Sequence, residues 1–372
     1  MNHSTSGRKH YLDNIRWITV VLVVLYHAIY MYTPIIPLGV GPITNQAVQY
    51  QDAYLYMVYP WFMVILFLVS GMSARYYLEK HSHKEFIRTR TRKLLVPSTI
   101  GLFVFQWILG YVSMSMTGAF DSFEAVPMPI LYFIMVLSGT GPLWYIQMLW
   151  IFSLVLVLIR KIEKDRLWTL GGRFRKLGII GLILLVIPVF LSAQILNMPI
   201  ITVYRFGLYG FCFLLGYYIF SHDEVIAILN KHAIWLVVVA VILGIAYTII
   251  YFGENYGDAP VNRNILNTAF LWMACLAILG IMNRFFDRSN SFTAWMNKRS
   301  FGLYVFHYLP AAAFAYFVGK DSSMPAVIVY LLTILAAFAG GYLLNEILSH
   351  IPLLRWAILG IKKNKEADHV QG

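Results

Sequence analysis

The stretch YLDNIRWITVVLVVLYHAIYMY, residues 11–32, is almost wholly apolar after Arg16 and contains one further ionisable side chain, His27. An apolar helix of about 20 residues is long enough to cross the hydrocarbon core of a bilayer. More runs of this kind follow along the chain, and a shorter one at 129–137 could be interfacial or re-entrant. The sequence therefore predicts an all-α, polytopic integral membrane protein with about ten transmembrane helices, at residues 17–32, 54–74, 94–113, 143–159, 178–196, 206–220, 233–252, 264–282, 300–319 and 325–348.

The composition supports this class. Of 372 residues, 59% are hydrophobic and 12% are charged, whereas soluble domains average about 25% charged residues. The mean hydropathy of +0.67 likewise excludes a soluble globular chain. The two cysteines, Cys212 and Cys275, lie in apolar runs without ligand motifs nearby, so neither a disulfide framework nor a metal site is predicted. We expect one membrane domain over residues 1–372, with short polar cytoplasmic tails at 1–10 and 361–372.

The positions of the basic residues predict the orientation, because cytoplasmic loops are enriched in Lys and Arg. When the connections between the predicted spans are assigned alternately to two sides, all but three of the 29 Lys and Arg residues fall on one side. Both termini share that side, so we expect an N-in, C-in protein of the inner, or cytoplasmic, membrane. The exceptions are Arg205, Arg263 and Lys320. The net charge of +12 then reflects topology and attraction to anionic lipid, and no nucleic-acid partner is predicted.

Ionisable side chains within a span are costly and commonly functional. Arg16 and His27 are eleven residues apart, which places them on one stripe of a helix, about 16 Å apart along its axis. Asp13 lies on much the same face. Arg16 could simply be a positive charge that snorkels to the cytoplasmic surface. His27 could be a structural histidine bonded to a carbonyl, or the general base of a cavity in the membrane, since imidazole titrates near neutral pH.

This opening resembles that of the membrane acyltransferase-3 family, whose first helix has an Arg, ten intervening residues and a His. The resemblance continues through Ser70-Gly71 and the basic segment from Arg88 to Pro97, and resumes at Gly141-Pro-Leu-Trp144-Tyr145, at Ser300-Phe-Gly-Leu-Tyr304-Val-Phe-His307, and from Glu346 to Pro352-Leu-Leu-Arg355. Within the family the chain looks most like the group that includes glucan biosynthesis protein C. It departs from the family pattern Arg-x-x-Arg, because Lys93 stands at the second Arg and lacks its planar fork.

The resemblance implies transfer of an acyl group, commonly acetyl or succinyl, from cytoplasmic acyl-CoA (acetyl-CoA or succinyl-CoA) to a hydroxyl, commonly of a carbohydrate or glycolipid beyond the membrane. His27 is then expected to be the general base that deprotonates the acceptor, and a transient acyl-imidazole is a less favoured variant. Polyanionic acyl-CoA would bind basic residues at the cytoplasmic face. Candidates on the predicted side are Arg16, Arg88, Arg90, Arg92 and Lys93, although the positive-inside rule alone also accounts for this cluster.

Other polar residues are candidates for the same cavity. Ser300, Tyr304 and His307 fall at i, i+4 and i+7 on one face of the predicted ninth helix, and core packing of this stripe is as good an interpretation as a catalytic role for Tyr304 and His307. We expect the remaining candidates to line the substrate cavity, although Trp at a helix end is commonly an interface anchor and a carboxylate there could pair with Arg355. These residues are Asp13, Trp144, Tyr145, Gln147, Ser300 and Glu346.

A secondary transporter or flippase for a saccharide or lipid is the alternative function, because ten spans with polar residues at mid-depth also describe a transport path. Such transporters typically show paired repeats with matching broken helices, and no such pairing is visible in the sequence. A non-catalytic role in envelope assembly or sensing is a third possibility. Acylation of proteins would need a different His/Asn signature. The sequence specifies neither the acyl group, the acceptor nor the oligomeric state.

Overall fold

The computed structural model describes residues 8–35, 38–43, 49–199 and 201–362, so the predicted tails lie almost entirely outside it. In these ranges the chain is helical, and β-structure is limited to one isolated bridge between Asn197 and Arg205. The predicted all-α class is confirmed. In chain order the α-helices are α1 (His10–Tyr30), α2 (Ala53–Leu78), α3 (His83–Arg90), α4 (Val96–Gly101), α5 (Trp107–Met116), α6 (Met128–Ser138), α7 (Trp144–Glu163), α8 (Arg166–Gly171), α9 (Phe174–Leu184), α10 (Val186–Gln194), α11 (Phe206–Tyr218), α12 (Asp223–Tyr251), α13 (Ala259–Asn262), α14 (Ile265–Phe285), α15 (Ser291–Phe306), α16 (Tyr308–Phe314), α17 (Ala326–His350) and α18 (Pro352–Leu359).

The described residues contain fewer candidate membrane spans than the sequence predicted. Two bent pairs, α9 with α10 and α15 with α16, each count as at most one span. The predicted sixth span, 206–220, corresponds to the 13-residue helix α11, which is too short to cross the hydrocarbon core alone. Seven helical stretches in the described residues are long and apolar enough to cross a membrane, or nine with both bent pairs: His10–Tyr30, Tyr50–Leu78, His83–Met116, Gly141–Glu163, Asp223–Tyr251, Ile265–Phe285 and Ala326–His350. The count of ten is thus not confirmed, and the N-in, C-in orientation stays a prediction.

Contacts within the chain define two compact units. Unit 1 comprises Met1–Leu22, Tyr56–Lys80 and Val155–Ser300, and unit 2 comprises Val23–Leu55, His81–Leu154 and Phe301–Gly372.

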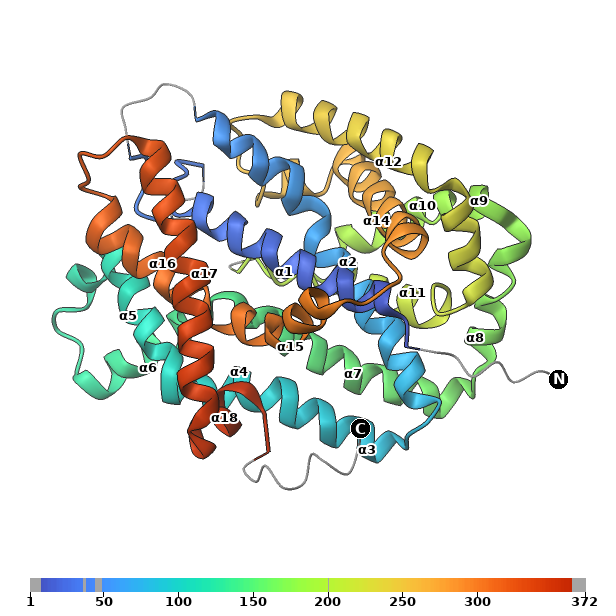
Figure 1. The fold of residues 1–372 in the computed structure, drawn as a ribbon, viewed down its shortest axis with the longest axis horizontal. Coiled ribbons are helices and arrows are strands. Elements are labelled where there is room, and N and C mark those ends of the chain that lie inside the picture. The colour runs from blue at the N-terminus through green and yellow to red at the C-terminus, as the bar shows by residue number, and fades with distance from the viewer. Residues whose placement is uncertain (1–7, 36–37, 44–48, 200, 363–372) are drawn as a thin grey trace. The chain divides into compact units, whose positions relative to one another are not determined.

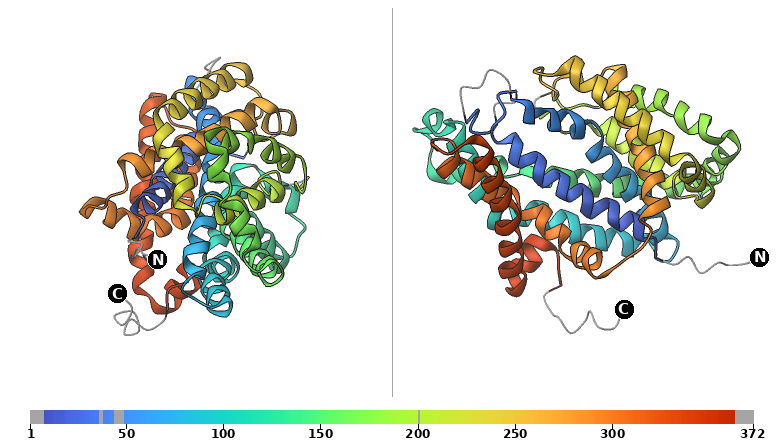
Figure 2. Two further views of the ribbon diagram at one scale, coloured as in Figure 1. Left: turned by 90° about the vertical axis from the view of Figure 1, so that its right-hand side faces the viewer. Right: turned by 45° about the horizontal axis from the view of Figure 1, so that its top comes forward.

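In unit 1, α12 and α14 lie side by side, as both Figure 1 and Figure 2 show. Trp272 of α14 is fully buried, and its indole N–H donates to the carbonyl of Leu182 at 2.9 Å. By contrast, α12 exposes large apolar side chains, including Ile242 and Ile249. Apolar side chains on the outside of a helix that hydrogen-bonds its own backbone suit contact with lipid. We infer that α14 belongs to the core of unit 1 and that α12 lies at its surface.

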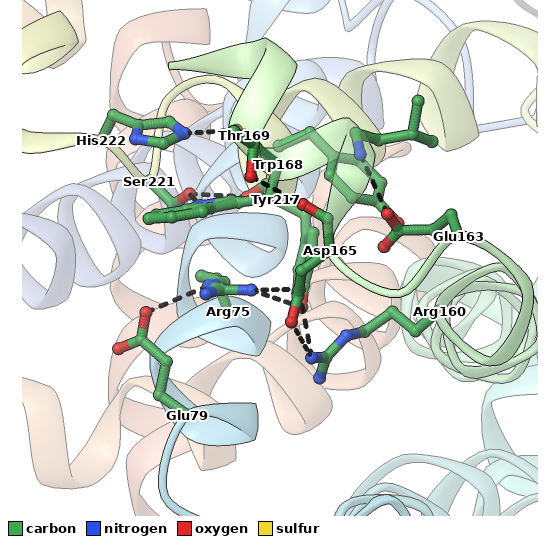
Figure 3. A network of polar contacts seen from close by, with 12 residues as sticks. Arg75, Glu79, Arg160, Glu163, Asp165, Trp168, Thr169, Tyr217, Ser221 and His222 are labelled. Carbon is green, nitrogen blue, oxygen red and sulfur yellow. Dashed lines mark hydrogen bonds and ion pairs between the residues drawn. The ribbon is translucent and has the colours of Figure 1, made fainter.

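A network of ion pairs joins the ends of several helices in unit 1 (Figure 3). Asp165, between α7 and α8, accepts from Nη1 of Arg75 on α2 at 2.7 Å and from Nη2 of Arg160 on α7 at 3.1 Å. The Arg75 guanidinium also stacks 4.2 Å above the Trp168 ring on α8. Trp168 in turn stacks on His222, which precedes α12, with ring centroids 4.1 Å apart. This network ties α2, α7 and α8 to the start of α12.

Asp165 sets the pH dependence of this network. Burial alone would raise the pKa of its carboxyl, but the hydrogen bond and charge of Arg75, with the charge of Arg160, outweigh burial and hold this pKa below its ordinary value. A carboxyl with a depressed folded-state pKa stabilises the fold above its unfolded-state pKa and loses that contribution as the pH falls through the folded-state pKa. Burial lowers the pKa of His222, so protonation of this ring also disfavours the folded chain at low pH.

We expect Asp165→Asn to cost about 1 kcal/mol at pH 7, a value discounted for screening because the Asp165 side chain is 43% exposed. The midpoint of thermal unfolding should fall by about 2–4 °C. Variant and wild-type midpoints should converge as the pH falls below the ordinary Asp pKa of about 4 and through the depressed folded-state pKa, where the wild-type carboxyl protonates. Thermal unfolding in detergent at a series of pH values measures this, with Asp121→Asn, an exposed carboxylate in the 3-10 helix Ala119–Phe123, as the control. A difference that persists unchanged at low pH would contradict the assignment.

In unit 2, α5 and α6 cross closely because glycines stand at the contact. A Cβ atom at Gly110 would lie 1.7 Å from the carbonyl oxygen of Met135, and one at Gly139 would lie 2.0 Å from that of Gln106. Small residues at such crossings let membrane helices approach each other without side-chain clashes. In the same unit α16 packs on α17, and α4 packs on α18.

Candidate active site

His27 and His307 come together in unit 2, although they are 280 residues apart in the sequence. Nδ1 of His27 lies 2.9 Å from Nε2 of His307, and the ring centroids are 5.1 Å apart. His27 is in the last turn of α1. His307 lies at the break between α15 and α16, where the helical axis bends by 50°. The break therefore presents His307 to the end of α1.

The sequence contains a cause for this break. Pro310 has no N–H to donate to the carbonyl of Phe306, and its ring would clash with that carbonyl in a straight helix. Accordingly, α15 ends at Phe306. The predicted stripe of Ser300, Tyr304 and His307 runs from α15 into this break, where the N–H of His307 still donates to the carbonyl of Leu303 at 3.0 Å, and its role in a cavity stays a prediction.

The hydrogen bonds of His307 assign the tautomers of both imidazoles. Nδ1 of His307 lies 3.0 Å from the carbonyl oxygen of Leu303 and 2.9 Å from that of Tyr304. Because carbonyls only accept, Nδ1 of His307 holds the proton, and in a neutral ring its Nε2 accepts. The donor to that Nε2 is Nδ1–H of His27. His27 is thereby left with its lone pair on Nε2.

Aromatic rings surround His27. Tyr308 contacts its ring at a centroid distance of 4.7 Å and an interplanar angle of 82°, and Tyr26 does so at 5.3 Å and 79°. His307 is completely buried, whereas His27 keeps partial exposure. His27 is thus the more exposed of the two histidines.

Tyr304 holds the start of α7 in place. Its hydroxyl donates to the carbonyl of Pro142, and its ring lies 6.0 Å from that of Tyr145. Trp144 in turn contacts Tyr145, with ring centroids 6.5 Å apart. Gln147, one turn further along α7, donates to the carbonyl of Ser98 at 3.1 Å. These contacts connect the predicted cavity residues of α7 with α4 and α15 inside unit 2.

In unit 1, Arg16 is held between two oxygen acceptors. Its Nη1 donates to Asp13 at 2.8 Å, and its Nη2 donates to the hydroxyl of Ser73 on α2. Asp13 also accepts from Arg8 at 2.8 Å. The Arg16 side chain remains 36% exposed. Its guanidinium is thus oriented by the protein and still accessible.

The basic cluster differs from the sequence-based expectation in its local structure. Arg88 and Arg90 end α3, and Arg92 and Lys93 lie in a π-helical turn, Thr91–Leu95, that leads directly into α4. The cluster was expected at a helix start near Leu94, but the helical run is continuous from His83 to Met116. Arg90 packs over the ring of Phe86 at 5.1 Å, whereas Arg88 and Lys93 are exposed. The four side chains thus differ in their surroundings.

A family model described as an acyltransferase domain matches residues 9–346. The chain belongs to the acyltransferase-3 family. No curated protein and no solved structure matches it. Family membership confirms the resemblance found in the sequence and shows a multi-pass membrane acyltransferase; a place in the glucan biosynthesis protein C group stays a prediction.

Two more predicted cavity residues of this acyltransferase, Ser300 and Glu346, lie on α15 and α17. Ser300 donates to the carbonyl of Asn297 within α15, at 3.3 Å. Glu346 lies near the end of α17 and is partly exposed. The described residues include no group of three or more His, Cys, Asp or Glu side chains arranged to hold a metal ion.

Sequence reasoning missed two side chains that contact predicted site residues, one in each unit. Tyr308 follows His307 directly and packs on His27, and Ser73 bonds Arg16. Pro310 could have indicated Tyr308, because this proline locates the helix break next to a histidine. The Arg16–Ser73 contact joins residues 57 positions apart, and no local pattern reports it.

Proposed function

We propose that this acyltransferase moves an acyl group, acetyl or succinyl, from cytoplasmic acyl-CoA to a hydroxyl of an extracytoplasmic or envelope carbohydrate, with His27 as general base. The observation that supports this role is the His27–His307 hydrogen bond, which leaves the lone pair on Nε2 of a partly exposed imidazole. A general base needs that lone pair within hydrogen-bond reach of the acceptor hydroxyl.

In the proposed reaction Nε2 of His27 takes the proton from the acceptor hydroxyl as the oxygen forms a bond to the thioester carbonyl carbon. The tetrahedral intermediate then collapses with cleavage of the C–S bond. The leaving thiolate takes the proton from the His27 imidazolium, and the products are the acyl ester and free CoA thiol. The His307 imidazole keeps Nδ1–H of His27 engaged throughout, so the base keeps one orientation.

On the donor side, the proposal assigns Arg16 and the basic cluster to the phosphates of acyl-CoA. Arg16 is the best placed, because Asp13 and Ser73 fix its direction and leave it accessible. A guanidinium held in this way can form charge-assisted hydrogen bonds to phosphate oxygens. Arg88 and Lys93 are exposed and add positive charge on the same predicted face of the membrane.

We expect Arg16→Ala to raise KM for acyl-CoA by about 10-fold with a smaller change in kcat, because loss of one charge-assisted contact costs about 1.5 kcal/mol. The KM of Arg16→Lys for acyl-CoA should lie between those of the wild type and Arg16→Ala, since Lys keeps the positive charge but lacks the planar fork of Arg. Arg8→Ala is the matched control, because Arg8 pairs with the same Asp13 and is 71% exposed. Initial rates in membrane vesicles at varied acyl-CoA test this. An equal rise in KM for the Arg8 and Arg16 variants would argue against a specific contact.

The function itself is tested by measuring ester groups. Envelope glycans from source cells with and without the protein are compared by mass. Loss of one acyl mass from one glycan fraction in the deficient cells would support the proposal and name both the donor group and the acceptor. Unchanged esters in every glycan fraction, with the protein present and folded in the control cells, would contradict a carbohydrate acceptor.

A further inference from the structure

Arg205 is a buried cation. The distribution of Lys and Arg in the sequence predicts that it lies on the side of the membrane that has few basic residues. It is only 2% exposed and directly precedes α11 in unit 1. Its backbone is fixed by the bridge to Asn197 and by the 3.0 Å hydrogen bond from the N–H of Phe206 to the carbonyl of Leu196. An ionised group at low dielectric is costly unless it is paired or fully hydrogen-bonded.

The protein meets this requirement only in part. Nη2 of Arg205 donates to the carbonyl of Asn262 at 2.9 Å, and the side chain also hydrogen-bonds to Tyr209. Its Nε–H has no acceptor among the residues that the structure describes. Among the described residues, no Asp or Glu forms an ion pair with this guanidinium.

Three further buried polar atoms near Arg205 have no hydrogen-bond partner in the part of the chain that the structure describes. These atoms are Oδ1 of Asn262, Oδ1 of Asn267 and the hydroxyl of Tyr247. Asn267 donates at 2.7 Å to the Asn262 carbonyl, which also accepts from Arg205. Tyr247 is close enough to Arg205 to interact with its charge. The Arg205 cluster, defined as Arg205, Tyr209, Tyr247, Asn262 and Asn267, therefore joins α11, α12, α13 and α14 at one end of unit 1.

We propose that the Arg205 cluster binds a hydroxylated oxyanion, such as a sugar acid or a polyol phosphate. The Nε–H of Arg205 needs an acceptor, and an oxyanion also neutralises the buried charge. The two amide oxygens need donors, which an oxyanion alone lacks and ligand hydroxyls supply. The hydroxyl of Tyr247 can do either. A ligand that has both kinds of group offers partners to all four unpaired atoms.

The assignment depends on the contacts of Arg205 and not on the proposed acyl transfer. The unpaired atoms are covered in this structure. A ligand therefore reaches them only when the connection between α12 and α14, which supplies Asn262, shifts away from Arg205.

The test uses the purified full chain in nanodiscs of phosphatidylcholine, whose headgroup has no net charge. Thermal unfolding is followed by tryptophan fluorescence with glucuronate, glycerol 1-phosphate or the neutral sugar glucose. Glucuronate or glycerol 1-phosphate should raise the Tm by about 5 °C at saturating concentration, and glucose should not. The stronger of the two anions tells whether the site selects a carboxylate or a phosphate.

Arg205→Gln should abolish the shift, and Tyr247→Phe, which removes one hydroxyl, should weaken binding by about 3-fold or more. Lys320→Gln, at an exposed cation on the same predicted side, and His27→Ala should respond like the wild type. The His27 variant separates this site from the acyl-transfer site. No shift with either anion, an equal shift with glucose, or an undiminished shift in both Arg205→Gln and Tyr247→Phe would overturn the proposal.

Discussion

Replacing His27 by alanine is expected to lower the rate of acyl transfer by about 10²–10⁴-fold, the usual contribution of a positioned general base. The variant loses the proposed base, the partly exposed imidazole that contacts His307. The ring deleted lies at the end of α1 among Tyr26 and Tyr308, and α1 keeps its apolar contacts. The measurement is transfer of labelled acyl groups from acyl-CoA to the envelope fraction in inverted membrane vesicles.

The control is a second histidine within an apolar helix. His232 in α12 accepts a hydrogen bond from the indole of Trp235 at 2.9 Å. It belongs to unit 1, whereas His27 and His307 belong to unit 2. His232→Ala at equal membrane level should leave transfer close to the wild-type rate. Near-normal transfer by the His27→Ala protein would refute the assigned base.

The spans followed from the sequence because their signal is local. Apolar length predicted α7, α14 and α17 to within about four residues at each end, but it placed the start of α1 seven residues late. The same signal placed the start of α12 ten residues late, because charged residues, among them Asp223 and Lys231, interrupt the apolar residues of its first turns. It also counted α11 as a span, since an apolar helix of 13 residues has the composition of a span without its length.

The site was only partly accessible to such reasoning. Arg16 and His27 were identified because they are ionisable residues on an apolar helix. His307 was a candidate, but its contact with His27 depends on a bend between α15 and α16 and on how α1 packs, which no spacing rule reports. The Arg205 cluster was hidden for a related reason, because hydrogen-bond satisfaction is a property of the packed structure and the sequence showed only an isolated Arg.

His307→Leu is expected to lower kcat by about 10²-fold while KM for acyl-CoA stays within about 2-fold. Leucine fills the site but accepts no hydrogen bond, so Nδ1–H of His27 loses its partner and the ring loses its fixed tautomer and direction. In a catalytic triad, replacement of the group that orients the base lowers the rate because the base takes the wrong tautomer, even though the base itself remains in place. His307 is therefore assigned as a positioning residue.

His307→Gln separates positioning from a purely structural role. The Gln side chain offers a carbonyl oxygen as acceptor to Nδ1–H of His27 and an amide N–H to the carbonyls of Leu303 and Tyr304, which His307 now bonds at 3.0 and 2.9 Å. It should therefore restore at least about 10-fold of the rate lost in His307→Leu. If packing alone mattered, leucine, with its similar bulk and apolar character in a completely buried position, would be the milder change. Rates of the Leu variant equal to or above those of the Gln variant would show that the His27–His307 hydrogen bond does not orient the base.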